Sequence, residues 1–348
     1  MGNAKKRSGS VASMLPVLLA CSFTASFGQS MMNVALPELA ERFGVTLSIA
    51  NWVIVGYMVV AATAIMLSAF MLRRLGLRRV FFVGAGALAL GSACALLSQD
   101  FPMLFASRLV QAVGTGLFFP SVTSVIMTNS PAAVRGTRLA LNSGVIAVGL
   151  AISPTASGFA LTQFGWRAMF VVSLAMSVAL LAVGFFRIHG GPSTKRVPID
   201  ALSVMLGPLG LAAFLYGLGE VTRDLAPSLA ALAVGAVLLA LFAWRQFALE
   251  SPLLDLHPLV HPRFAVGILL VMVGMLTSFS MSILLPLYYE GALGYTAFFA
   301  GLLLLGPVLV NAAWAAGCST GTARGRSYRR ASCSCSSGRR RRSSRPRA

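Results

Sequence analysis

Ten long apolar runs constrain the fold of this 348-residue chain more than any other feature of its sequence. Each is about as long as the ~20 residues with which an α-helix crosses ~30 Å of hydrocarbon. The runs lack the alternating pattern of barrel strands, and only helices or closed barrels span a bilayer. We therefore predict an all-α membrane protein of about ten transmembrane helices. The runs are residues 13–36, 50–72, 80–98, 102–127, 139–163, 168–186, 201–219, 226–244, 264–288 and 295–317.

The composition excludes an ordinary soluble enzyme. Only 11% of the residues are charged and 57% are hydrophobic, whereas about 25% of a soluble domain is charged. The first apolar run follows Lys5, Lys6 and Arg7, a pattern also found in cleaved signal peptides. This run continues for 24 residues and nine more follow, which favours an uncleaved first span.

The net charge of +19 lies mostly outside the apolar runs. Ten arginines follow residue 318 without any acidic residue. When the predicted spans alternate from a cytoplasmic N-terminus, fourteen of the other basic residues fall in cytoplasmic segments and three in outer loops. Because basic residues concentrate on the cytoplasmic side, we predict that both termini are cytoplasmic.

The last residues, 318–348, are rich in Arg and Ser and carry almost no aliphatic side chains. Such a segment cannot build a core and is typical of a disordered tail. It could bind anionic lipid headgroups or nucleic acid. The abrupt change of composition would also result from a shifted reading frame. These interpretations of the tail stay open. The basic residues outside the tail are explained by membrane topology, so the high net charge does not favour nucleic acid as a partner.

The polar breaks divide the chain into six predicted segments. Residues 1–12 form a basic cytoplasmic N-terminus, and 13–186 a six-helix bundle. A cytoplasmic loop at 187–200 contains two glycines and a proline. Two linker helices at 201–244, an incomplete second bundle of two helices at 245–317 and the tail at 318–348 follow.

One formal charge, Arg108, lies deep in a predicted span. A charge at that depth is costly and marks a functional site or a buried structural contact. Gln111 shares its helix face, and Gln29 and Asn33 share a face of the first span. Asn142 lies in the fifth span. Such polar groups either line a cavity or join helices, and the sequence does not separate these roles.

No enzymatic or metal-binding pattern is present in the sequence. It has no phosphate-binding G-x-x-x-x-G-K-[ST] loop. His257 and His261 are four residues apart, but Pro258 and Pro262 interrupt any helix that would align them. We therefore predict no enzyme activity, no metal and no cofactor.

Short motifs follow one another in a fixed order between residues 13 and 312. Pro154 lies between Gly149 and Gly158, and is predicted to kink the fifth span. The others are Asn33-Val34-Ala35-Leu36-Pro37, Trp52 and Tyr57, Arg73-Arg74-Leu75-Gly76-Leu77-Arg78-Arg79, Arg108 with Gln111 and Gly114, Gly165-Trp166-Arg167 with Phe170, Gly217-Leu218-Gly219-Glu220, and Leu254-Asp255-Leu256.

This ordered series resembles the major facilitator superfamily, and within it the fourteen-span drug:proton antiporter branch. The resemblance implies a bacterial inner-membrane protein that exports hydrophobic or cationic compounds by alternating access, driven by inward proton flow. The implied substrate or proton pathway comprises Arg108, Gln111, Gln29, Asn33, Tyr57 and Asn142. The implied conformational motifs comprise Arg74, Gly76, Arg78, Gly149, Pro154 and Gly158.

The sequence departs from that branch at several positions. Gly28 stands where the branch has the first-span Asp of its proton site, and Arg73 stands at the Asp of its second loop. Four further spans predicted by the resemblance are replaced by the Arg-rich tail. Three hypotheses remain. In the first, the chain is a working transporter, with a partner chain that supplies the missing helices or as a uniporter. In the second, it is a truncated or frame-disrupted relative without stand-alone activity. In the third, it is a membrane-anchored protein whose tail binds anionic lipid or nucleic acid.

Overall fold

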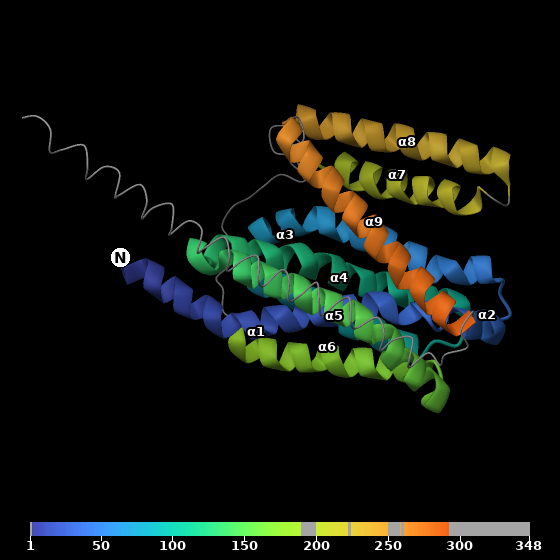
Figure 1. The fold of residues 1–348 in the computed structure, drawn as a ribbon, viewed down its shortest axis with the longest axis horizontal. Coiled ribbons are helices and arrows are strands. Elements are labelled where there is room, and N and C mark those ends of the chain that lie inside the picture. Colours follow the sequence, from blue (N-terminus) through green and yellow to red (C-terminus); the bar gives the residue numbers. More distant parts are fainter. Residues whose placement is uncertain (1, 189–199, 222–223, 250–257, 259–260, 292–348) are drawn as a thin grey trace, which may run out of the picture.

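The computed structural model describes residues 2–188, 200–221, 224–249, 258 and 261–291, and the elements in these residues are helices (Figure 1). Seven of these helices are long and apolar enough to cross a membrane. The bounds are α1 Gly2–Ser30, η1 Met31–Asn33, α2 Leu36–Phe43, α3 Leu47–Leu96, α4 Phe101–Asn129, α5 Ala132–Phe164, α6 Arg167–Arg187, α7 Ala201–Glu220, α8 Leu225–Ala248 and α9 Pro262–Gly291.

The structure confirms the all-helical prediction. The predicted number of about ten spans stays a prediction. Helix α3 holds the second and third predicted spans, and α9 covers the ninth. The tenth predicted span and the Arg-rich tail lie outside the described residues. The division into six segments therefore stays a prediction.

Helix α3 holds the predicted runs 50–72 and 80–98 as two helical halves that meet at a kink at Gly76. Its 50 residues are helical except at Gly76, where φ is 78° and ψ is 163°. Only glycine adopts such a conformation readily, so the chain changes direction at a single residue. Arg73, Arg74, Arg78 and Arg79 are exposed in the flanking helical turns.

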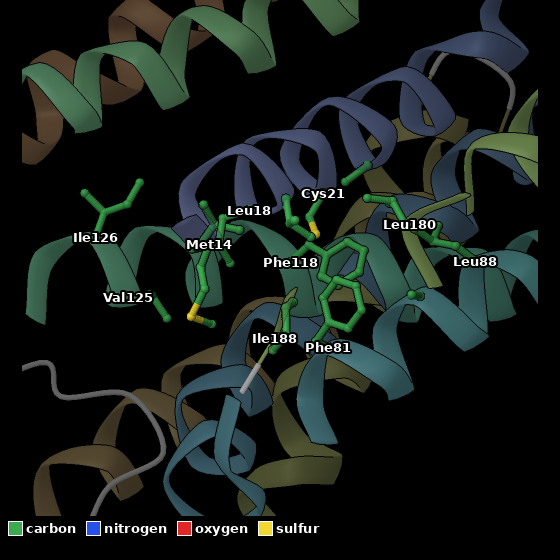
Figure 2. Packing of buried hydrophobic residues seen from close by; sticks show 14 residues of the cluster. Met14, Leu18, Cys21, Phe81, Leu88, Phe118, Val125, Ile126, Leu180 and Ile188 are labelled. Atoms are coloured by element: carbon green, nitrogen blue, oxygen red, sulfur yellow. The ribbon is translucent and has the colours of Figure 1, made fainter. Parts of the chain in front are cut away.

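Two apolar clusters hold the first six spans together. In one, Phe81 of α3 and Phe118 of α4 pack with ring centroids 5.9 Å apart, beside Leu18 and Cys21 of α1 (Figure 2). The other cluster joins the opposite ends of the same helices and includes Phe170 of α6. Together they position α1, α3, α4 and α6 around the layer between them.

Small residues bring α4 close to both halves of α3. A Cβ added at Gly114 would lie 2.5 Å from the carbonyl oxygen of Gly84. One added at Gly116 would overlap the carbonyl oxygen of Ala61. Glycines at such positions let membrane helices approach backbone to backbone, so α4 is held between the two halves of α3.

A bidentate ion pair joins the beginning of α7 to the end of α8. Arg245 donates from Nε to Oδ2 of Asp200 at 2.7 Å and from Nη2 to Oδ1 at 2.9 Å. Ser203 also donates to Asp200, and Gln246 donates to Ser203. The hydrogen bonds from the Arg245 guanidinium hold the pKa of the Asp200 carboxyl well below its usual range.

Acidification is therefore expected to loosen the α7–α8 pair. Because the folded pKa of Asp200 lies below the unfolded value of about 3.9, its stabilising contribution is complete above that value and is lost as pH falls through the folded pKa. The protection factors of the α7 amides, which compare observed with intrinsic hydrogen exchange at the same pH, should fall below about pH 3.9 in the wild type. In Asp200→Asn the protection factors should already be low at neutral pH; equal protection in both proteins at neutral pH would contradict this assignment.

Candidate functional site

Helix α4 carries three polar side chains at intervals of three and four residues, Arg108, Gln111 and Thr115. Residues with this spacing share one helix face. All three are buried, and Arg108 and Thr115 have no exposed surface. The face points into the six-helix bundle rather than toward lipid.

The Arg108 guanidinium is held by neutral groups. Its Nη1 donates to Oε1 of Gln111 at 2.6 Å and to the carbonyl oxygen of Gly28 at 3.0 Å. Its Cζ lies 4.2 Å from the centre of the Tyr57 ring, a cation–π distance. The Tyr57 hydroxyl is 2.5 Å from Oγ1 of Thr115, and either can donate.

Gln111 extends this network to two further helices. Its Nε2 donates to Oγ of Ser92 in α3 at 2.7 Å. Ser92 donates to Oγ of Ser173 in α6 at 3.1 Å. One chain of hydrogen bonds therefore runs from α1 through α4 and α3 to α6. We call Arg108, Gln111, Tyr57, Thr115, Ser92 and Ser173 the polar layer.

The polar layer separates the two apolar clusters. Along α4, one cluster contains Leu104 and the other contains Phe118, and the polar residues lie between them. The same order holds on α3, where Ser92 lies between Leu88 and Ala95. The charge of Arg108 is thus confined to a thin layer with apolar packing on both sides.

The end of α1 supplies carbonyl groups to this region. Helix α1 ends at Ser30, so its last carbonyl groups have no partner within the helix. Arg108 donates to the carbonyl oxygen of Gly28, and Ser153 of α5 donates to the carbonyl oxygen of Phe27 at 2.7 Å. A cation at a helix C-terminus is favoured by the helix dipole, which gives Arg108 partial compensation.

The other predicted pathway residues do not all join the polar layer. Asn142 of α5 is buried and accepts a hydrogen bond from Ser22 of α1 at 2.7 Å. Gln29 is half-buried and Asn33 is exposed. Because α1 gives way to the 3₁₀ turn η1 after Ser30, Asn33 does not continue the helical face of Gln29 as predicted.

The predicted conformational motifs occupy bends and close contacts. Arg74 and Arg78 flank the bend at Gly76 and lie over Phe70 and Phe82, at 5.8 and 6.0 Å from the ring centres. A Cβ at Gly149 would overlap Oγ of Ser26, whereas one at Gly158 would make an ordinary contact with Val34. Helix α5 is not interrupted at Pro154. Any role of these residues in a conformational change stays a prediction.

The polar layer also contains residues that the sequence did not single out, Ser92, Thr115 and Ser173. Their only signal is a hydroxyl group within an apolar run. Many serines in these runs bond only to their own helix, as Ser107 does with the carbonyl oxygen of Leu104, so that signal has little specificity. Among the described residues, no group of three His, Cys, Asp or Glu side chains could hold a metal ion.

Comparison with known proteins agrees with this architecture. Residues 18–337 match the sequence profile of the Major Facilitator Superfamily. The chain is 32% identical over 303 residues to lincomycin resistance protein LmrB of Bacillus subtilis, covering 86% of this chain and 63% of that protein. It is 27% identical over 295 residues to multidrug export protein EmrB of Escherichia coli K12, covering 83% and 57%. It therefore spans 57–63% of the length of these curated relatives.

Solved structures show the same fold at low sequence identity. A POT family transporter in complex with a thioalcohol-conjugated peptide superposes with a TM-score of 0.60 at 18% identity, over 85% of this chain and 67% of that one. The proton:xylose symporter XylE superposes with a TM-score of 0.59 at 14% identity, over 90% and 69%. These likenesses confirm the predicted fold class, an all-α bundle of the major-facilitator type. The family match, the transporter relatives and the seven candidate membrane helices support integral membrane localisation.

Proposed function

Since the chain belongs to the Major Facilitator Superfamily, we propose that it takes part in exporting small hydrophobic or cationic compounds by alternating access. The buried polar layer around Arg108 carries this proposal, because an intramembrane ionisable residue in a bundle interior is typical of a substrate or ion pathway. The relatives named as lincomycin resistance and multidrug export proteins support this class of substrate.

We propose proton antiport as the driving force, with weak coupling in this sequence. The membrane helices α1 and α3–α6 contain no Asp or Glu. Gly28, beside Arg108, stands where the antiporter branch has its proton-binding Asp. Coupling through these helices therefore has no carboxylate to use.

The proposed setting is the bacterial inner membrane with the N-terminus in the cytoplasm. Basic residues support this orientation, because Arg74, Arg78, Arg135 and Arg138 lie in segments that the alternation of spans places on the cytoplasmic side. The six-helix bundle, the linker helices and any further helices that complete the transport path would act together. Those helices could belong to this chain or to a partner chain.

Transport in membrane vesicles tests the proposal. Everted vesicles containing the full chain should accumulate lincomycin or a cationic dye above vesicles without it. Arg108→Gln should lower the initial rate of this uptake about 10-fold or more, because it removes the cation and its bond to Gly28 and places an uncharged side chain beside Gln111. About 1–3 kcal/mol for a buried polar group left unpaired supports that range.

Arg79→Gln is the matched control, because Arg79 is exposed beside Gly76 and lies outside the polar layer. It should transport as the wild type does. Transport that is equal in wild type and Arg108→Gln would contradict a pathway through the polar layer. Complete absence of transport in the wild type would instead favour a relative without stand-alone activity.

A further inference from the structure

Two of the three nitrogens of the Arg108 guanidinium have no hydrogen-bond partner among the described residues. These are Nε and Nη2, and both are fully buried. Nη1 alone makes the bonds to Gly28 and Gln111. Unpaired donors on a buried cation are costly, so their persistence requires an explanation beyond the joining of helices.

The two unpaired nitrogens lie on one edge of the guanidinium. A carboxylate can accept from Nε and Nη2 together through two parallel hydrogen bonds. This protein uses the same edge elsewhere, since Arg245 binds Asp200 through its Nε and Nη2 at 2.7 and 2.9 Å. The free edge of Arg108 therefore matches a carboxylate in shape and in charge.

The protein supplies no carboxylate to this edge from the helices that surround it. The groups that face Arg108 are the Tyr57 ring, the Gln111 amide and the carbonyl oxygen of Gly28, all uncharged. The acidic residues between residues 2 and 188 lie outside α1 and α3–α6, with Glu38 and Glu41 in the short helix α2 and Asp100 just before α4.

Space for a small group begins at Gly28. A Cβ added there meets no heavy atom within 4 Å beyond its own helix and chain neighbours. This contrasts with Gly114 and Gly116 of α4, where an added Cβ meets backbone at once. The open space therefore lies at Gly28, the residue whose carbonyl oxygen accepts a hydrogen bond from Arg108.

We infer that Arg108 and Gly28 form a binding site for a carboxylate group carried by a ligand. The ligand carboxylate accepts from Nε and Nη2 of Arg108 and uses the space that an acidic side chain at position 28 would fill. The two oxygens of a planar carboxylate match the two parallel donors one to one, whereas a halide has to accept both hydrogen bonds on a single centre at less linear angles. This ligand is distinct from the hydrophobic or cationic cargo proposed above, and the inference rests on the proposed function only in so far as both use the interior of the bundle.

Thermal unfolding of the full chain in lipid nanodiscs tests the site without any proton gradient. Formate and acetate are titrated at constant ionic strength against chloride and against phosphate. In the wild type, Tm should rise with carboxylate concentration and saturate with a Kd on the order of 1 mM, as for two charge-assisted hydrogen bonds partly offset by desolvation. Chloride, with a single acceptor centre, and phosphate, which also accepts through two oxygens but is larger, should both bind more weakly than formate.

Variants distinguish the site from the basic surface. Gly28→Asp should raise the basal Tm and abolish the response, because its own carboxylate takes the place of the ligand. Arg108→Gln should also abolish it, and Arg79→Gln, on the surface, should keep it. No saturable rise in the wild type, a rise with chloride or phosphate that matches the rise with formate, or a response that persists in Gly28→Asp would overturn the inference. Failure of export in vesicles would leave this binding result unchanged, so the two proposals fail separately.

Discussion

Replacing Gly28 with Asp is expected to make export by this chain strongly dependent on the pH gradient. The new side chain fits, because a Cβ at Gly28 meets no heavy atom within 4 Å, and the Nε and Nη2 donors of Arg108 are unpaired nearby. Protonation of this carboxylate would break its pair with Arg108. Proton binding and the packing of α1 against α4 would thereby become linked.

The size of the effect follows from the energy in the gradient. One pH unit supplies about 1.4 kcal/mol per proton, which supports about a tenfold concentration ratio of substrate when one proton moves per cycle. We expect Gly28→Asp to approach this ratio in everted vesicles and to lose it when an uncoupler collapses the gradient. The wild type should respond to the uncoupler much less.

Gly28→Asn is the matched control, because Asn has the size of Asp without its charge or its titration. It should leave accumulation as insensitive to the uncoupler as in the wild type. If the Asn and Asp variants behave alike, the effect is one of size. If the wild type already shows the full tenfold ratio, the assignment of weak coupling to Gly28 is wrong.

The architecture could be predicted from the sequence because membrane spans obey a simple length rule. An apolar run either reaches ~20 residues or does not, and each of the described helices α1 and α3–α9 contains most of one or two predicted runs. The pairing of Arg108 with Gln111 was also accessible, since a separation of three residues places both on one face of α4.

Contacts between helices could not be predicted in the same way. The bond from Gln111 to Ser92 depends on the axial register of α4 against α3, and no local pattern encodes that register. The position of Asn33 depends on where α1 ends, and the change to a 3₁₀ turn after Ser30 moves it off the face of Gln29. The single-residue bend at Gly76 was likewise hidden within a basic segment that suggested a loop.

Replacing Gly116 with Ala is expected to destabilise the packing of α4 against α3 more than a glycine-to-alanine change at the other glycines discussed above. The added Cβ would overlap the carbonyl oxygen of Ala61 and lie 2.6 Å from the Cβ of Ala64. A backbone carbonyl cannot rotate away as a side chain can, so α4 must move from the first half of α3. Overpacking of this kind costs about 1–3 kcal/mol, and we expect the upper end of that range in thermal unfolding of the chain in nanodiscs.

Gly86→Ala in α3 is the matched control, because the chemical change is identical and an added Cβ meets nothing within 4 Å. There the higher helix propensity of Ala should stabilise the chain by about 0.5–1 kcal/mol. The two substitutions should therefore shift Tm in opposite directions. If Gly116→Ala also raised Tm, close backbone approach between α4 and the first half of α3 would not be what holds Arg108 and Thr115 in register with Tyr57. The polar layer would then have to owe its geometry to its own hydrogen bonds.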